Sequence, residues 1–129
     1  MRVSILYLCA ALVILTGNDL HSASGYEQVS IVQLLANPED YLNKKVRVKG
    51  YFKVQMVPAL FLTEPSARMA DLASAIELVE PSKIGEMSLS CNDKYIVING
   101  VFLRQDFRYK VSEIISAHDA ITLETCFEN

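Results

Sequence analysis

One expected strand carries a row of cations and an aromatic ring on a single face. In KKVRVKGYFKV, residues 44–54, every second side chain points the same way if the segment is extended. Phe61 is expected on the neighbouring strand. Cations beside rings can hold an anionic polymer by charge and stack on its flat groups. The candidate ligand-binding residues are therefore Arg47, Lys49, Tyr51, Lys53 and Phe61.

The same alternation is also typical of a strand whose outer face is simply exposed to water. Glu77 is expected to face outward on a nearby strand, and the chain has 12 Lys and Arg against 15 Asp and Glu, a net charge of −3. No overall positive field then attracts nucleic acid or anionic lipid. We therefore do not expect nucleic acid as the partner of this row of cations.

Groups able to catalyse a reaction are few. Once the N-terminal segment is set aside, His118 is the remaining histidine, and its neighbour Asp119 would point to the opposite face of a strand. One histidine without thiols or carboxylates at suitable spacing makes no zinc site. The sequence contains no phosphate-binding loop, dinucleotide-binding glycine pattern or nucleophile elbow. We expect no catalytic residue, no metal and no cofactor, and rank an enzyme last among the hypotheses.

Residues 1–24 are predicted to be a secretory signal peptide. Arg2 precedes an apolar run over residues 3–14, and small residues follow in HSASG. The alternative is a membrane anchor, but the run is shorter than the about 20 apolar residues that a spanning helix needs. Cleavage after Ala23 or Ser24 leaves residues 25–129 as one domain with no membrane span and a net charge still of −3. The protein is then periplasmic or secreted.

Two cysteines remain after that cleavage, Cys91 and Cys126, in a compartment that is oxidising. An even pair there favours a disulfide over a metal site. If a turn lies at residues 106–109, positions 91 and 126 are equidistant from it and meet at the open end of a hairpin. The alternative is a pair of buried free thiols.

The hydrophobic pattern predicts one short helix followed by five strands. Ser30 and Gln33 form a capping-box pattern at the start of an amphipathic helix, which ends at Asn37 and Pro38 before one further turn. The segments 64–74 and 81–93 are expected to be connections with a brief helical turn each. The expected strands cover residues 45–54, 59–63, 75–79, 94–105 and 111–124.

A glycine lies inside each of the two clearest strands, Gly50 in the first and Gly100 in the fourth. Glycine inside a strand costs on the order of 1 kcal/mol, so its presence twice in matching positions suggests that the backbone bends there. Bends allow long strands to coil and a five-stranded sheet to close into a small barrel, which removes its edges. The alternative is an ordinary sandwich in which each glycine is a weak point.

The segment VSIVQLLANPEDYLNKKVRVKGYF resembles the start of a family of small exported bacterial proteins with an OB fold similar to tRNA-anticodon-binding domains. The resemblance lies in an amphipathic helix, then Asn-Pro-Glu, a tyrosine, a turn and Lys-Lys-Val-Arg-Val-x-Gly, and it extends to KYIVINGVF. Asn43 stands at the usual glycine position of the turn, where Asn tolerates a positive φ. The resemblance implies a mainly β fold, a five-stranded OB barrel with a short N-terminal amphipathic helix. It does not imply tRNA binding, because the family's name describes a shape.

Taken together, the sequence predicts an exported, non-enzymatic OB-fold binding module. Its ligand would be a protein, peptide or glycan of the cell envelope, because OB folds use their outer strand face to bind extended polymers. One alternative is a nucleic-acid or acidic-polymer binder that uses the basic face of the first strand. Another is an inhibitor or immunity-type protein. The oligomeric state stays open.

Overall fold

The computed structural model describes residues 25–128, and they form a mainly β protein. The predicted signal peptide lies outside the described residues. The elements in chain order are β1 Glu27–Gln28, α1 Ile31–Ala36, η1 Pro38–Asp40, β2 Lys45–Val54, β3 Pro58–Phe61, α2 Glu64–Arg68, η2 Leu72–Ser74, β4 Ala75–Val79, α3 Pro81–Cys91, β5 Lys94–Gln105 and β6 Arg108–Asp119.

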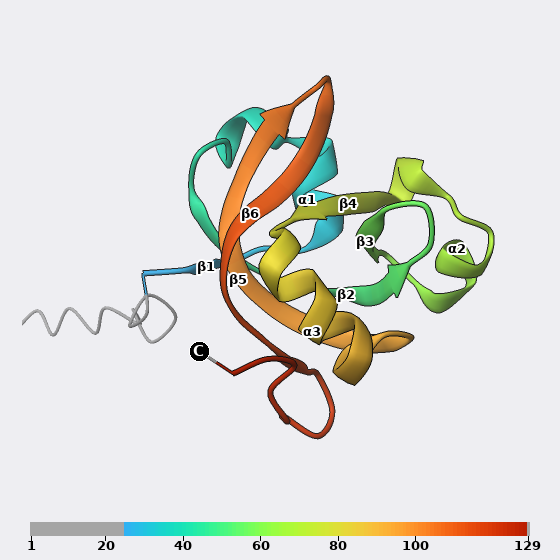
Figure 1. Ribbon diagram of the computed structural model, residues 1–129. Helices are drawn as coiled ribbons and strands as arrows, with labels where there is room; N and C mark the ends of the chain where they lie inside the picture. The colour runs from blue at the N-terminus through green and yellow to red at the C-terminus, as the bar shows by residue number, and fades with distance from the viewer. Residues whose placement is uncertain (1–24, 129) are drawn as a thin grey trace, which may run out of the picture.

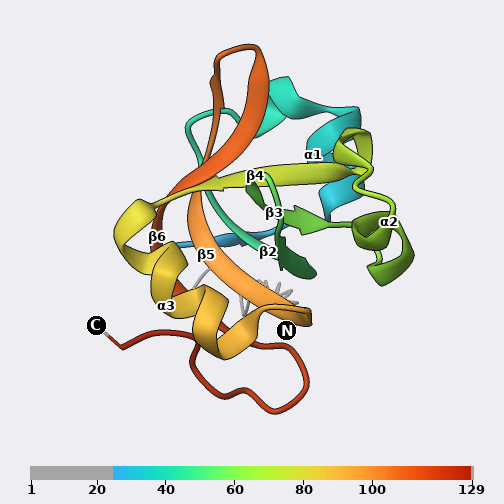
Figure 2. The ribbon, with the colours of Figure 1, turned by 45° about the vertical axis from the view of Figure 1, so that its right-hand side comes forward.

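The six strands form one mixed sheet in which five of them connect in a closed ring. The order is β1-β2-β3-β4-β6-β5, and β5 pairs again with β2. The pairings of β1 with β2 and of β4 with β6 are parallel, and the others are antiparallel. Figures 1 and 2 show that β2 and β5 are long and strongly curved. The ring through five strands agrees with the predicted closure of the sheet.

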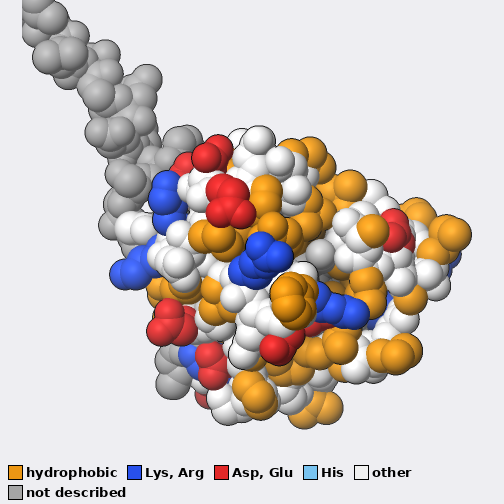
Figure 3. All heavy atoms as spheres, turned by 90° about the horizontal axis from the view of Figure 1, so that it is seen from above, with side chains coloured by type: hydrophobic (Ala, Val, Ile, Leu, Met, Phe, Trp, Pro, Cys, Tyr) orange, Lys and Arg blue, Asp and Glu red, His pale blue; other side chains and the backbone are white. Residues whose placement is uncertain are grey.

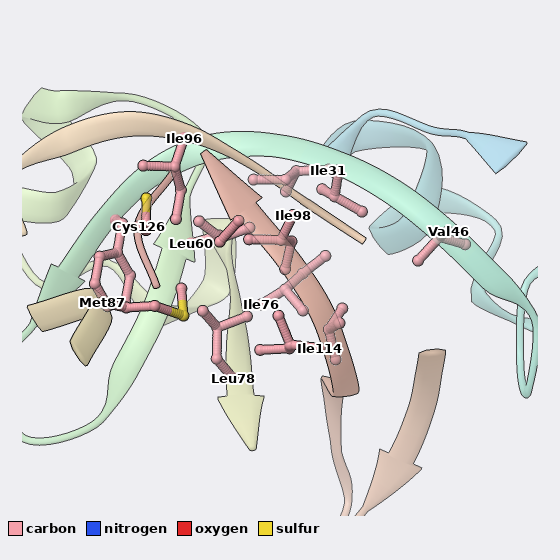
Figure 4. Packing of buried hydrophobic residues seen from close by; sticks show 14 of the residues in the cluster. Ile31, Val46, Leu60, Ile76, Leu78, Met87, Ile96, Ile98, Ile114 and Cys126 are labelled. Atoms are coloured by element: carbon pink, nitrogen blue, oxygen red, sulfur yellow. The ribbon is translucent and has the colours of Figure 1, made fainter. Parts of the chain in front are cut away.

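The hydrophobic core fills the inside of this ring. The side chains that alternation predicts to point inward are buried, and Figure 4 shows several of them meeting residues of α1, α3 and β6. α1 contributes Ile31 and Leu34, and α3 contributes Met87. The inward residues of β2 and β5, each with 0% of its surface exposed, are Val46, Val48, Phe52, Ile96, Ile98 and Phe102.

The two strand glycines are explained by close packing rather than by left-handed backbone. A Cβ atom on Gly100 would lie 2.5 Å from Val111 Cγ1 and 2.7 Å from the Ser112 carbonyl oxygen. Gly100 also lies at the register shift between β5 and β6, where the left-handed residue is Glu113, with a φ of 48°. A Cβ atom on Gly50 would lie 3.0 Å from the Phe61 carbonyl oxygen. Both strands therefore need glycine at these positions.

The N-terminal helix forms as the sequence predicts. The Ser30 hydroxyl accepts a hydrogen bond from the Gln33 amide at 3.1 Å, and the Gln33 side chain accepts one from the Ser30 amide at 2.9 Å. Asn43 adopts a φ of 62°, as expected for the turn before β2. The prediction for residues 81–93 was wrong, because α3 spans eleven of them, Pro81–Cys91.

Cys91 and Cys126 form the predicted disulfide, with their Cα atoms 5.6 Å apart. The bond joins the last residue of α3 to the segment that follows β6. α3 and the C-terminal segment lie together at the end of the ring opposite the β5–β6 turn (Figures 1 and 2). A disulfide is consistent with a protein outside the cytoplasm. Among residues 25–128, no helix is long and apolar enough to cross a membrane.

Candidate functional site

The cations predicted to share one face of β2 separate into two groups. Arg47 and Lys49 point outward near the start of β2, where the Arg47 Nε donates a hydrogen bond of 2.9 Å to the Asn99 side chain. Lys53, near the end of the strand, forms an ion pair of 2.7 Å with Asp93. That hydrogen bond to Asp93 raises the pKa of Lys53. The positive charge of Lys53 is therefore paired with the Asp93 carboxylate, whereas Arg47 and Lys49 face an open part of the surface.

The predicted rings of this face, Tyr51 and Phe61, are buried, with 7% and 2% of their surfaces exposed. They pair across β2 and β3 and form a second hydrophobic cluster with Ala59, Ala67 and Ala75. The expectation that these rings lie exposed beside the cations was wrong. The pairing of the two strands was predicted, but alternation does not reveal that α2 lies over their outer face.

α2 closes this outer face because its start is held by side chains. The Thr63 hydroxyl accepts a hydrogen bond from the Ser66 amide at 3.2 Å, and the Ser66 side chain caps the Thr63 amide in return. Ala67, the buried residue of α2, packs on the rings of the cluster. We call this region, made of Tyr51, Ala59, Phe61, Ala67, Ala75 and the partly buried Tyr95, the sealed face.

Tyr95 of β5 links the sealed face to α2. Its ring lies edge-on to Tyr51, with the centroids 5.1 Å apart, and its hydroxyl accepts a hydrogen bond of 3.1 Å from the Glu64 amide. Burial raises the pKa of the Tyr51 hydroxyl, and the carboxylates of Asp93 and Glu64 raise it further. Tyr51 therefore stays neutral and serves packing.

Next to the sealed face, the outward side chains of β2, β5 and β6 form the floor of an open groove. In the register of these strands, Lys49 lies opposite Val97, which in turn lies opposite His118. The adjacent row is Arg47, Asn99 and Ser116. Neighbouring strands are about 4.8 Å apart, so the backbones of Lys49 and His118, which are two strands apart, are separated by about 10 Å across the floor.

The rest of the groove lining comes from β1, the start of α1, Leu62 and Tyr95. We call it the basic groove; its lining includes Tyr26, Glu27, Gln28, Gln33, Arg47, Lys49, Val97 and His118. Its polar groups can bind an anionic or hydrogen-bonding ligand. Sequence reasoning did not assign Tyr95 and His118 to a site, although pairing β5 with β6 predicts their outward direction.

His118 and Asp119 act in different places, as their opposite directions on a strand predict. His118 faces the basic groove, whereas the Asp119 carboxylate accepts hydrogen bonds from the amides of Ile121 and Thr122 at 2.7 and 3.0 Å. These two hydrogen bonds lower the pKa of Asp119, and the bond from the Thr122 amide has the larger effect. Asp119 therefore shapes the loop after β6 rather than orienting the histidine.

No group of three or more His, Cys, Asp or Glu side chains among residues 25–128 is placed to hold a metal ion. No protein-family model matches the chain, and no curated protein matches it.

Proposed function

We propose that this chain is an exported, non-enzymatic binding module with an OB fold. The fold proposal is supported by the strand order of the ring, by the parallel pairing of β4 with β6, and by the helix α3 between β4 and β5. An OB fold is a small five-stranded barrel of this kind that binds extended polymers on its outer strands. The motif-level resemblance of residues 29–52 and 94–102 points in the same direction.

The ligand is proposed to bind in the basic groove. The observation that carries this proposal is that Arg47 and Lys49 project into an open groove beside His118, while the neighbouring sealed face is covered by α2. The Arg47 guanidinium is held by Asn99, which fixes its position before a ligand arrives. Fixed cations of this kind favour a carboxylate or phosphate group on the ligand.

Among anionic ligands, we propose a carboxylate-bearing peptide, protein segment or glycan of the cell envelope. Single-stranded nucleic acid gains about 1–3 kcal/mol per base from stacking on aromatic side chains. The rings that could supply this in the predicted site, Tyr51 and Phe61, pack beneath α2. The two tyrosines that line the basic groove, Tyr26 and Tyr95, are themselves buried or partly buried. A charged groove with few exposed rings suits a peptide or an acidic sugar chain better than an oligonucleotide.

Calorimetric titration of residues 25–129 tests this proposal. The probes are an acidic peptide such as hexaglutamate, an oligogalacturonate and a single-stranded oligonucleotide of equal charge. We expect measurable affinity for one of the two carboxylate probes and weaker affinity for the oligonucleotide. A sub-micromolar, salt-sensitive affinity for the oligonucleotide would instead favour the nucleic-acid alternative.

Lys49→Glu and Lys44→Glu form a matched pair of variants. Both residues are exposed, but Lys49 lines the basic groove and Lys44 lies in the turn before β2. We expect Lys49→Glu to weaken the binding of the carboxylate probe by at least about tenfold, and Lys44→Glu to change it by less than about threefold. Equal losses in the two variants would mean that binding follows overall charge rather than the groove.

A further inference from the structure

The turn between β5 and β6 has an unusual composition for its backbone. Gln105 pairs with Arg108, so Asp106 and Phe107 form a two-residue hairpin loop. Both are in the left-handed region, with φ values of 52° and 62°. Loops of this type normally use Asn-Gly or Gly-Gly, because a side chain at positive φ is strained. Phenylalanine is therefore a poor choice for the turn itself.

The Phe107 ring also contributes nothing to packing within residues 25–128. It is 92% exposed, at the tip of a hairpin that projects from the body of the protein (Figures 1 and 2). Figure 3 views the molecule from the end where this turn lies, and there hydrophobic side chains are interspersed with Lys and Arg. An exposed aromatic ring at a strained position needs a reason other than stability.

The hairpin that carries this ring is braced on the rest of the sheet. The Tyr109 ring stacks on Phe102 with the centroids 5.6 Å apart, and the Arg104 guanidinium lies over Tyr109 at 5.9 Å. Arg108 and Lys110 both form ion pairs with Glu77 of β4. The tip is therefore held in one orientation, which lowers the entropy lost when it binds.

Two arginines flank the ring on opposite faces of the hairpin. Arg104 shares its face with Tyr109, and Arg108 shares the other face with Gln105, because side chains alternate along each strand. Arg104 forms no ion pair with any of the described residues, and the Arg108 side chain is 56% exposed despite its pairing. A surface that receives Phe107 therefore meets a cation on each side of the ring.

We infer that the β5–β6 turn is a protein-docking element, in which Phe107 inserts into an apolar pocket of a partner protein whose rim carries carboxylates. Aromatic and arginine side chains are the residues that most often dominate the binding energy of protein interfaces. The inference rests on the proposed function only in treating the chain as a binding module, since Phe107 is not part of the basic groove. A pocket-filling turn also favours the inhibitor alternative.

A lipid bilayer fits this tip less well than a protein pocket does. Phe107 is the single apolar residue of the segment 105–108. One ring gives too little apolar area for stable partition into a membrane. A second copy of the chain also fits poorly, because two copies with a net charge of −3 each repel one another.

The inference is tested by incorporating a photo-crosslinking phenylalanine analogue at position 107 of the protein, expressed in the cells that naturally make it. The control places the same analogue at position 56, because Met56 is 98% exposed in the turn after β2. We expect a discrete protein adduct from position 107 that position 56 does not give. An absent adduct, or one with phospholipid or with the chain itself, would overturn the inference.

The captured protein is then purified and titrated with variants of the mature protein. We expect Phe107→Ala to weaken its binding by at least about 30-fold and Met56→Ala by less than about twofold. Arg104→Ala should weaken it by about threefold to tenfold, and more at low salt. Binding unchanged by Phe107→Ala would contradict the inference.

Two further measurements distinguish a docking role of Phe107 from a role in folding or in the basic groove. Phe107→Gly should leave the urea midpoint unchanged or raise it, because glycine suits the turn, and a marked fall would assign the ring to folding. Phe107→Ala should leave titration of the basic groove with the carboxylate probe unchanged, and Lys49→Glu should leave the cross-link intact. If the carboxylate probe does not bind but the cross-link from position 107 forms, the proposal of a groove ligand is contradicted and the docking role of the turn is supported.

Discussion

The outer surface of the five-strand ring has two neighbouring regions that the same strands build and that differ in what covers them. On the sealed face, the side chains of Tyr51 and Phe61 point outward and are buried by α2. In the basic groove, Arg47 and Lys49 point outward from the same strand and stay accessible. Alternation along a strand thus decides whether a side chain points inward or outward. The connection between β3 and β4, which contains α2, decides whether an outward-facing region can bind a ligand.

The boundary between these regions runs through Gly50. A Cβ atom there would point into the core, where it would meet the side chains of Ile31 and Leu60 and the Phe61 carbonyl oxygen of β3. α1 and β3 can approach β2 this closely because glycine leaves the space. α1 and β3 therefore pack on the inner face of β2 at the residue that lies between the two outer regions, and this packing is testable by mutation.

The largest expected effect is on the sealed face, where Phe61→Ala should lower the free energy of unfolding by about 3–4 kcal/mol. Phe61 is 2% exposed, and its truncation leaves a cavity beneath α2. The matched variant Lys49→Ala in the basic groove should change stability by less than about 0.5 kcal/mol. Urea unfolding measures both, and a small loss for Phe61→Ala would mean that α2 does not seal this face.

At the boundary, Gly50→Ala should destabilise the protein by about 1–3 kcal/mol, because a Cβ atom would press on backbone and side-chain atoms within 3.0 Å. Gly85 of α3 is the control, since a Cβ there meets no atom within 4 Å. Gly85→Ala should stabilise by about 0.5–1 kcal/mol through helix propensity. Thermal unfolding measures both, and the same sign for the two substitutions would contradict the packing argument.

A smaller effect is expected for Tyr95→Phe, which removes the hydrogen bond from the Glu64 amide to the Tyr95 hydroxyl. The loss should be about 0.5–1.5 kcal/mol. It should appear first as faster amide hydrogen exchange in Glu64–Arg68, because that bond fixes the start of α2. Unchanged exchange in this helix would show that Tyr95 does not hold the cover in place.

The smallest effect is a pH dependence that arises at Asp119. Its pKa is lower in the folded protein than in the unfolded chain, because the amides of Thr122 and Ile121 stabilise the carboxylate. This stabilisation is complete at neutral pH, and it is lost as the pH falls from about 3.9, the ordinary carboxyl pKa, through the lower folded value. Asp119→Asn should flatten the stability profile below about pH 4 without changing ligand binding at neutral pH. A steep profile that persists in the variant would assign the acid sensitivity to other carboxylates.

The sequence predicted β2, β4, β5 and the core well because alternation is a local signal. The fifth strand was expected at residues 111–124, but β6 is Arg108–Asp119, and the two-residue strand β1 was not predicted. β4 begins and ends at the predicted residues, and the inward side chains of β2 and β5 are those expected. α3 was missed because serines and a glycine dominate its surface. The spacing of Ile84, Met87 and Cys91, three and four residues apart, is a helical stripe that predicts it.

The site was predicted less well because it depends on contacts between distant segments. The cations of β2 were found from one strand alone, but burial of Tyr51 depends on α2, and the groove needs the register of β5 with β6. The disulfide pairing was right, yet the turn is Asp106 and Phe107 rather than residues 106–109. The register shift between Asn99 and Val101 offsets part of this difference in the position of the turn. Across the shift β6 has more residues than β5, which brings Cys126 closer to the level of Cys91.

The central claim is that ligand binds in the basic groove and not on the sealed face. Amide chemical shifts of residues 25–129, recorded while the carboxylate probe is added, test it most directly. We expect shifts to change at residues 47–50, 97–99 and 116–118, and to stay constant at 59–61 and 64–68. Changes confined to 59–68, with the groove unaffected, would show that α2 opens to admit ligand and would contradict the account.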